Sequence, residues 1–170
     1  KRDLNQSSHP ICKRGRTTMA WVRLDIDLAS GQALIEEVQT DWLRGAGWAR
    51  SSAIRAIKEG RPNAVIWEGG AAKRLKPFCD YVLERHAGDW AEVALSAAIE
   101  FLIGEIGISQ IWYHDSETGA RLKKIQWSKP PRSIYTSLPR SFCLEKTSQA
   151  PDFVVSTAPK VLARRMKRGQ

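Results

Sequence analysis

The stretch DWAEVALSAAIEFLIGEIGISQIWYH, residues 89–114, carries the strongest helix signal in the chain and then a strand signal. Asp89 is a natural N-cap, and Glu92 follows three residues later, as in a capping box. The polar positions of the helix recur every four residues, so they form one narrow stripe on an otherwise apolar surface. We therefore predict a helix over Asp89–Gly104 that is buried on most sides, followed by a central strand over Ile108–His114.

A β-hairpin is predicted upstream of this helix. Polar and apolar residues alternate along Ala20–Leu28 (AWVRLDIDL), which is typical of a half-buried strand. A turn signal separates this segment from the apolar segment Ala33–Gln39 (ALIEEVQ). We expect a glycine-containing loop over Thr40–Gly47 and then a helix over Trp48–Glu59, which Gly60 and Pro62 terminate.

The remaining segments complete an alternation of strands and helices. We predict a short buried strand at Ala64–Trp67 and a helix over Ala71–His86 that Pro77 either kinks or restarts. A further helix is expected over Glu117–Ile125, and two short strands lie around Pro139 within Ser133–Thr147. This order predicts an α/β (α+β) fold with a mixed central sheet flanked by helices, in a single domain.

The length and composition are those of one globular domain. The chain has 170 residues, of which 42% are hydrophobic, and seven of them are Trp. We expect a flexible basic lead-in at residues 1–18, the domain at 19–147 and a basic tail at 148–170. The three cysteines form no CxxC pair, which argues against a zinc site and favours reduced thiols in the cytoplasm. No apolar run approaches the length of a membrane helix.

The charge balance favours a polyanionic partner. Lys and Arg number 27 against 18 Asp and Glu, a net charge of +9. Such an excess suits nucleic acid, a phosphorylated cofactor or an acidic protein, although it also serves solubility alone. Nucleic-acid contacts are predicted in the basic C-terminal part, where cations alternate with aromatic residues, at Arg132, Arg140, Arg164, Arg165, Lys167 and Arg168.

A possible anion site lies between the hairpin and the next predicted helix. The sequence there is Arg44-Gly45-Ala46-Gly47. Glycines let a backbone approach a phosphate, and the free N–H groups at a helix start attract anions. The alternative is an ordinary strand-to-helix turn, since two glycines are a weak signal.

The element order resembles the GNAT superfamily of N-acyltransferases. In that family the pyrophosphate of acyl-CoA binds backbone amides between the fourth strand and the following helix, so the resemblance implies acetyl-CoA as cofactor and an amine as acceptor. Two placements are open. Either Arg44, Gly45 and Gly47 hold the phosphates, or residues 44–87 are an insertion and the turn at Gly88 and Asp89 takes that role. The resemblance also implies that the amides near Val38 hold the acyl carbonyl.

A second resemblance covers roughly residues 20–145. The string LIEEVQTDW (Leu34–Trp42) with a later Trp-led helix is similar to domains of phage-borne and other mobile-element polyproteins. This resemblance keeps an alternative open, in which the chain is a non-catalytic module that binds nucleic acid or protein in a mobile-element or defence system.

Four residues are candidates for acid–base chemistry. Glu37 on the second hairpin strand could deprotonate an amine, although a salt-bridged structural role is the alternative. His114, at the end of a predicted strand, could serve instead near neutral pH. Tyr113 or Tyr135 could protonate the leaving thiolate. No serine or cysteine signature accompanies them, so a nucleophilic triad is not predicted.

Overall fold

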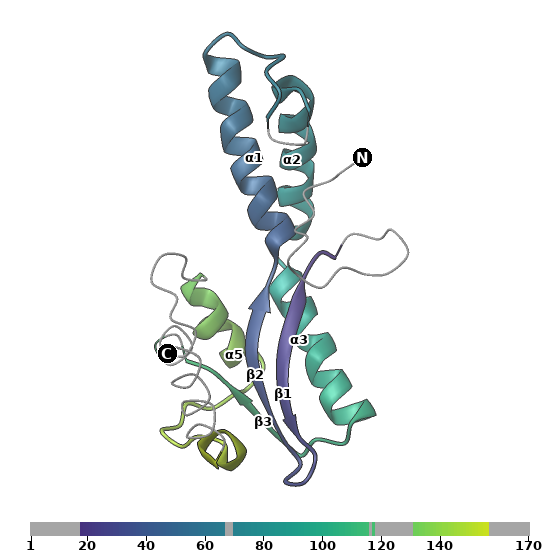
Figure 1. The fold of residues 1–170 in the computed structure, drawn as a ribbon, viewed down its shortest axis with the longest axis vertical. Helices are drawn as coiled ribbons and strands as arrows, with labels where there is room; N and C mark the ends of the chain where they lie inside the picture. The colour runs from purple at the N-terminus through teal and green to yellow at the C-terminus, as the bar shows by residue number, and fades with distance from the viewer. Residues whose placement is uncertain (1–17, 67–69, 116, 118–130, 157–170) are drawn as a thin grey trace, which may run out of the picture. The chain divides into compact units, whose positions relative to one another are not determined.

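The computed structural model describes residues 18–66, 70–115, 117 and 131–156. These residues form an α+β fold in which a mixed three-stranded sheet is combined with helices, as the sequence predicted (Figure 1). By their contacts the residues fall into two compact units, 1–21 with 38–94 and 22–37 with 95–170.

The sheet has the strand order β1-β2-β3. The predicted hairpin is confirmed as β1 (Trp21–Asp27) and β2 (Gln32–Gln39), and the later strand is β3 (Gln110–Tyr113). β2 runs parallel to β3, with Gln32 opposite Gln110 and Ile35 opposite Tyr113. The prediction of β3 as a central strand is wrong for the described sheet, because β2 lies between the other two. Adjacent residues of β2 are buried on both of its faces, as a central strand requires.

The tight turn between β1 and β2 also anchors the start of β3. Gly31 has φ +67°, a left-handed conformation that glycine adopts without a steric penalty. Its carbonyl oxygen accepts hydrogen bonds from the backbone N–H of Ser109 at 3.0 Å and of Gln110 at 3.2 Å. A Cβ at Gly31 would lie 3.1 Å from the Ser109 hydroxyl. The glycine therefore serves both the turn and the close approach of two segments far apart in the sequence.

The predicted loop over Thr40–Gly47 is wrong, because α1 (Asp41–Lys58) begins immediately after β2. Thr40 is the N-cap, and its hydroxyl accepts the backbone N–H of Leu43 at 3.3 Å. Asp41 in the first turn suits the positive end of the helix dipole and accepts bonds from the Trp21 indole and the Gln39 amide. These caps outweigh the helix-weakening effect of the two glycines that suggested a loop.

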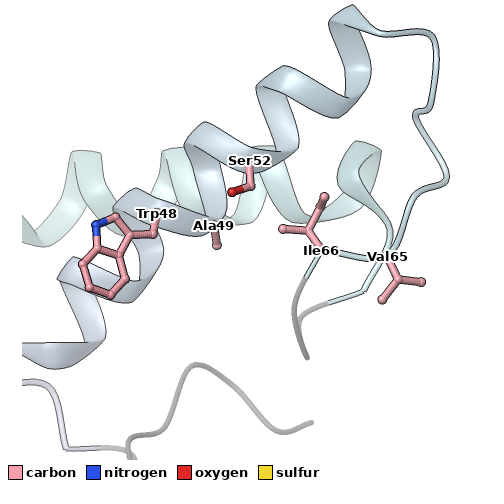
Figure 2. Close-up of a pocket in the computed structure, with 5 residues that line it drawn as sticks. All are labelled: Trp48, Ala49, Ser52, Val65 and Ile66. Carbon is pink, nitrogen blue, oxygen red and sulfur yellow. The ribbon is translucent and has the colours of Figure 1, made fainter.

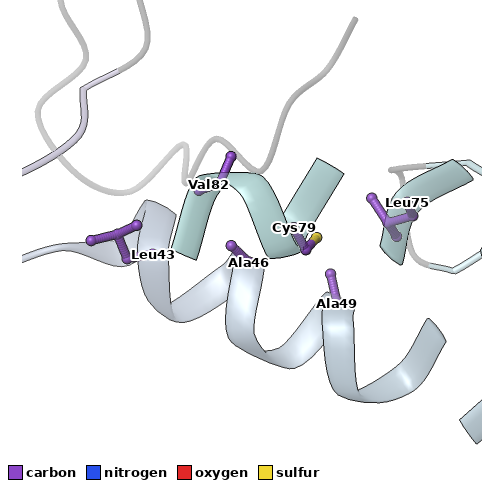
Figure 3. Packing of buried hydrophobic residues seen from close by; sticks show 6 residues of the cluster. All are labelled: Leu43, Ala46, Ala49, Leu75, Cys79 and Val82. Atoms are coloured by element: carbon purple, nitrogen blue, oxygen red, sulfur yellow. The ribbon is translucent and has the colours of Figure 1, made fainter. Parts of the chain in front are cut away.

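α1 packs antiparallel against α2 (Ala72–His86). Trp42 lies by His86 at one end of the pair, and Ala56 clusters with Ala72 at the other. Small residues on α1 allow a close approach, and the central cluster consists of Leu43, Ala46, Ala49, Leu75, Cys79 and Val82 (Figure 3). α2 is assigned as one helix with Pro77 inside it. The predicted strand 64–67 is wrong over its described part, where a single antiparallel bridge joins Val65 to Ala71.

The helix after residue 89 is less buried than predicted. α3 (Trp90–Glu100) continues into a π-helical turn, η2 (Phe101–Glu105). Leu95, Ala98 and Leu102 are buried, whereas Val93 is 55% exposed. The prediction of burial on most sides is therefore wrong, because only one line of residues at spacings of three and four meets the interior. The apolar composition overstated the buried surface.

The two strands predicted around Pro139 are also wrong. The segment forms a 3-10 turn, η3 (Arg132–Tyr135), and a short helix, α5 (Ser137–Ser141). The hydroxyls of Thr136 and Ser137 donate to the carbonyls of Arg132 and Ser133. Such local side-chain bonds compete with strand pairing. The predicted helix 117–125 lies outside the described residues except for Glu117, as do almost all of the lead-in and the end of the tail.

Candidate functional site

Three of the four residues predicted for acid–base chemistry lie together in the unit formed by residues 22–37 and 95–170. Because Ile35 pairs with Tyr113 and side chains alternate along a strand, Glu37 shares a face of the sheet with Tyr113. Tyr135 packs edge-on against Tyr113, with 6.1 Å between the ring centroids. The structure therefore brings Glu37, Tyr113 and Tyr135 to one end of the β2–β3 pair.

The Tyr113 phenol is held in a structural contact. It donates a hydrogen bond of 2.8 Å to the carbonyl oxygen of Ile134, twenty-one residues away. Burial raises the pKa of Tyr113 well above its ordinary value, and the nearby Tyr135 adds to that effect. A phenol that already donates a hydrogen bond to a carbonyl and whose pKa is raised is a poor proton donor to a thiolate. Of the two predicted donors, Tyr135 is the better placed.

Tyr135 is half-buried and lies within the electrostatic reach of Glu37. Its pKa is raised, first because burial disfavours the phenolate and second because the Glu37 carboxylate is negatively charged. The phenol is therefore protonated at neutral pH and available as a hydrogen-bond donor. This pairing of a carboxylate with a neutral phenol is the arrangement that a base and an acid in one site require.

Glu37 itself is only 8% exposed. The Arg23 guanidinium lies 3.8 Å from its carboxylate and 3.6 Å from that of Glu36. Arg23 is half exposed, so this pair is partly screened by solvent. The Arg23 guanidinium compensates the charge of this buried carboxylate, which suits both a structural carboxylate and a base.

β2 continues four residues past its last β3 partner. The described register ends at Ile35 and Tyr113, whereas β2 runs on through Val38 to Gln39. Val38 is buried. His114, the residue after β3, is also buried. It lies beyond the last paired residue of the strand, so the register of β2 and β3 does not place its side chain relative to Glu37.

The first predicted phosphate site lacks the geometry that motivated it. Arg44, Gly45 and Gly47 lie inside α1, so their N–H groups belong to helical positions and form no glycine loop. Arg44 pairs with Asp41 and lies over the Trp48 ring, 5.8 Å from its centroid. Gly45 is buried. The expectation of a loop-type anion site at these residues is corrected.

The second predicted phosphate site is an exposed turn before α3. Gly88 and Asp89 lie in this turn, and the Asp89 carbonyl accepts the backbone N–H of Val93 at 3.0 Å. A Cβ at Gly88 would meet no atom within 4 Å, so a side chain could be added there without a clash.

The predicted nucleic-acid residues are only partly described. Arg132 in η3 and Arg140 in α5 are both exposed. Arg164, Arg165, Lys167 and Arg168 lie outside the described residues. Within the described ranges no group of three His, Cys, Asp or Glu residues could hold a metal ion. No described helix is long and apolar enough to cross a membrane.

The α1–α2 pair carries functional candidates that the sequence reasoning missed. α2 exposes Arg74, Phe78, Tyr81 and Arg85, and α1 exposes Arg44, Trp48 and Arg55. Beside Trp48 there is an open pocket of about 430 Å³, lined by Trp48, Ala49, Ser52, Val65 and Ile66 (Figure 2). The signal was present in the sequence as cations and aromatics spaced four, seven and eleven residues apart on a helix.

No known protein family, curated protein or solved structure matches this chain. The GNAT resemblance and the mobile-element resemblance therefore stay predictions.

Proposed function

We propose that the chain is a divergent GNAT-like acyltransferase that uses acetyl-CoA to acylate an amine. The observation that carries this proposal is the buried Glu37 carboxylate on the sheet face of Tyr113, against whose ring Tyr135 packs, at the point where β2 runs on past β3. The connection from β2 through α3 to the parallel strand β3 supports the second placement of the family's helix. In that placement α1 and α2 are an insertion.

The proposed chemistry is a direct acyl transfer. The cofactor supplies an activated thioester. Glu37 takes a proton from the acceptor amine, directly or through a water molecule, as its nitrogen forms a bond to the acyl carbon. Tyr135 donates its proton to the sulfur as the carbon–sulfur bond breaks. The products are an amide and the free thiol. The backbone at Val38, the residue after Glu37, would hold the acyl carbonyl. The turn at Gly88 and Asp89, in the other compact unit, remains the candidate for phosphate.

Isothermal titration with acetyl-CoA tests the cofactor. We expect saturable heat with acetyl-CoA and less heat for Gly88→Trp, which fills the open turn. ATP is the control ligand, because a chain with a charge of +9 binds many polyphosphates weakly. Absence of heat with millimolar acetyl-CoA, or equal heat with ATP, would contradict the proposal.

Acid and base are tested separately from binding. Glu37→Gln and Tyr135→Phe should retain the acetyl-CoA heat but lower acetyl transfer to a mixture of primary amines by about 100-fold or more. Glu36→Gln is the matched control, because Glu36 pairs with the same Arg23 but lies on the other face of β2. If Glu37→Gln and Glu36→Gln lower the rate equally, Glu37 is not the base.

A further inference from the structure

We propose that one face of the α1–α2 helix pair binds single-stranded nucleic acid. This basic aromatic face consists of Arg44, Trp48 and Arg55 on α1 with Arg74, Phe78, Tyr81 and Arg85 on α2. The inference rests on the nucleic-acid-binding alternative and is independent of acetyl transfer, so the two can fail separately.

The residues of this face form one stripe on α1 and one on α2, and the two stripes lie on the same side of the helix pair. Arg50 of α1 and Asp80 of α2 form a 2.5 Å ion pair that marks the other side. At 100° per residue, Trp48 and Arg55 lie about 160° and 140° around α1 from Arg50. Around α2, Phe78, Arg85, Arg74 and Tyr81 lie about 160°, 140°, 120° and 100° from Asp80. Both stripes therefore point away from the Arg50–Asp80 side.

The cations on the two sides of the helix pair differ in whether they have carboxylate partners. On the Arg50–Asp80 side, Lys76 also pairs with Asp80 at 2.6 Å, so both cations there have a carboxylate partner. Arg55, Arg74 and Arg85 of the basic aromatic face are exposed, and none has a carboxylate within 4.0 Å among the described residues. Cations left unpaired on one side are suited to a backbone of phosphates.

The aromatic residues favour an unpaired strand over a duplex. Trp48 is 59% exposed, Tyr81 is 64% exposed and Phe78 is 42% exposed. Large exposed rings are costly in water unless they meet a partner, and rings between cations can stack on bases that have left a duplex. The Arg44 guanidinium over Trp48 adds a second planar group to that platform.

The pocket beside Trp48 offers a place for a base. Its volume of about 430 Å³ lies in the range of small-ligand sites, roughly 300–1,000 Å³. Apart from the indole N–H of Trp48, the only polar side-chain group among these lining residues is the Ser52 hydroxyl, which Figure 2 shows between Trp48 and Ile66. An unpaired base that stacks on Trp48 would cover this opening.

Fluorescence anisotropy with a labelled oligothymidylate tests the proposal. We expect the full chain to bind a strand of about 20 nucleotides more tightly than a duplex of equal length. Trp48→Ala and Tyr81→Ala should each weaken binding about 5-fold to 150-fold, the range for loss of one stacked base. Trp48→Phe, which keeps a ring, should restore most of the affinity.

The cations are tested by the salt dependence. The double variant Arg74→Gln with Arg85→Gln should lower the slope of log affinity against log salt by about 1.4, or 0.7 for each lost phosphate contact. Arg50→Gln with Lys76→Gln is the control, because it removes the same charge from the other side of the same helices. This control should change the slope far less.

Four results would overturn the inference. They are no binding at low salt, equal losses in the two double variants, a duplex bound as tightly as the single strand, and displacement by polyglutamate as efficient as by oligothymidylate. The last result would assign the face to an acidic protein. Circular dichroism shows whether each variant is folded. All of the substituted residues except the half-buried Lys76 are exposed, so folding is the expected outcome.

Discussion

Thr40 decides whether the chain continues from β2 into a loop or into a helix, and its hydroxyl can be removed without changing the backbone. The hydroxyl accepts the Leu43 N–H at 3.3 Å and donates to the Met19 carbonyl at 2.5 Å. Loss of an N-cap costs about 1 kcal/mol, and loss of a second partly buried hydrogen bond costs about 0.5–1.5 kcal/mol more. Thr40→Ala should therefore destabilise the fold by about 2 kcal/mol.

Urea unfolding followed by far-ultraviolet circular dichroism measures this change. For a chain of this length, about 2 kcal/mol also corresponds to a fall of about 4–8 °C in Tm. Thr40→Ser is the control, since it keeps the hydroxyl and both bonds and loses only a methyl group. We expect its stability to stay within about 1 kcal/mol of the parent chain. If the alanine and serine variants unfold at the same urea concentration, the hydroxyl does not start α1 and the reasoning is refuted.

Three further predictions concern the turn, α3 and alkaline pH. Gly31→Ala should destabilise the fold by about 1–2 kcal/mol in urea unfolding, because φ is +67° and the new Cβ approaches Ser109; an unchanged midpoint would show that the turn relaxes freely. Leu95→Ala should cost about 2–5 kcal/mol, whereas Val93→Ala, at an exposed position, should cost under about 0.5 kcal/mol; equal losses of unfolding free energy in the two variants would support the original prediction that α3 is buried on most sides. Burial, aided by the charge of Asp80, raises the pKa of Cys79, and Tyr113 also has a raised pKa. Stability should therefore be full below about pH 9, the ordinary thiol pKa, and fall as the pH rises further, because the unfolded chain releases these protons first. The urea midpoint of the double variant Cys79→Ala with Tyr113→Phe should fall less steeply over that pH range than the midpoint of the parent chain.

The boundaries of the helices show where local reasoning failed. Arg44, Gly45 and Gly47 favoured a loop because glycine weakens helices, yet they lie in α1. The cap at Thr40 and the packing of Ala46 and Ala49 against α2 stabilise the helix more than the two glycines weaken it. The apolar composition of residues 90–106 favoured full burial, yet Val93 is exposed. The composition of a helix shows how much apolar surface it has. How much of that surface is buried depends on the elements that pack against the helix.

The candidate site divides in the same way. Glu37, Tyr113 and Tyr135 could be selected from the sequence by residue type and by position on strands. Their meeting depends on the parallel register of β2 and β3 and on the hydrogen bond between Tyr113 and the Ile134 carbonyl. Neither contact has a local signal, because the two partners in each are separated by tens of residues.

By itself the sequence determined the β1–β2 hairpin, the existence of α2, α3 and β3, and the excess of positive charge. These follow from periodicity and composition, which act between residues near in the chain. Only the tertiary structure decided that β2 is the central strand, that Tyr113 is a structural phenol and that seven cations and aromatics of α1 and α2 share one face. Those outcomes depend on how elements pair and pack, since a side chain's neighbours across an interface are set by the register of two segments.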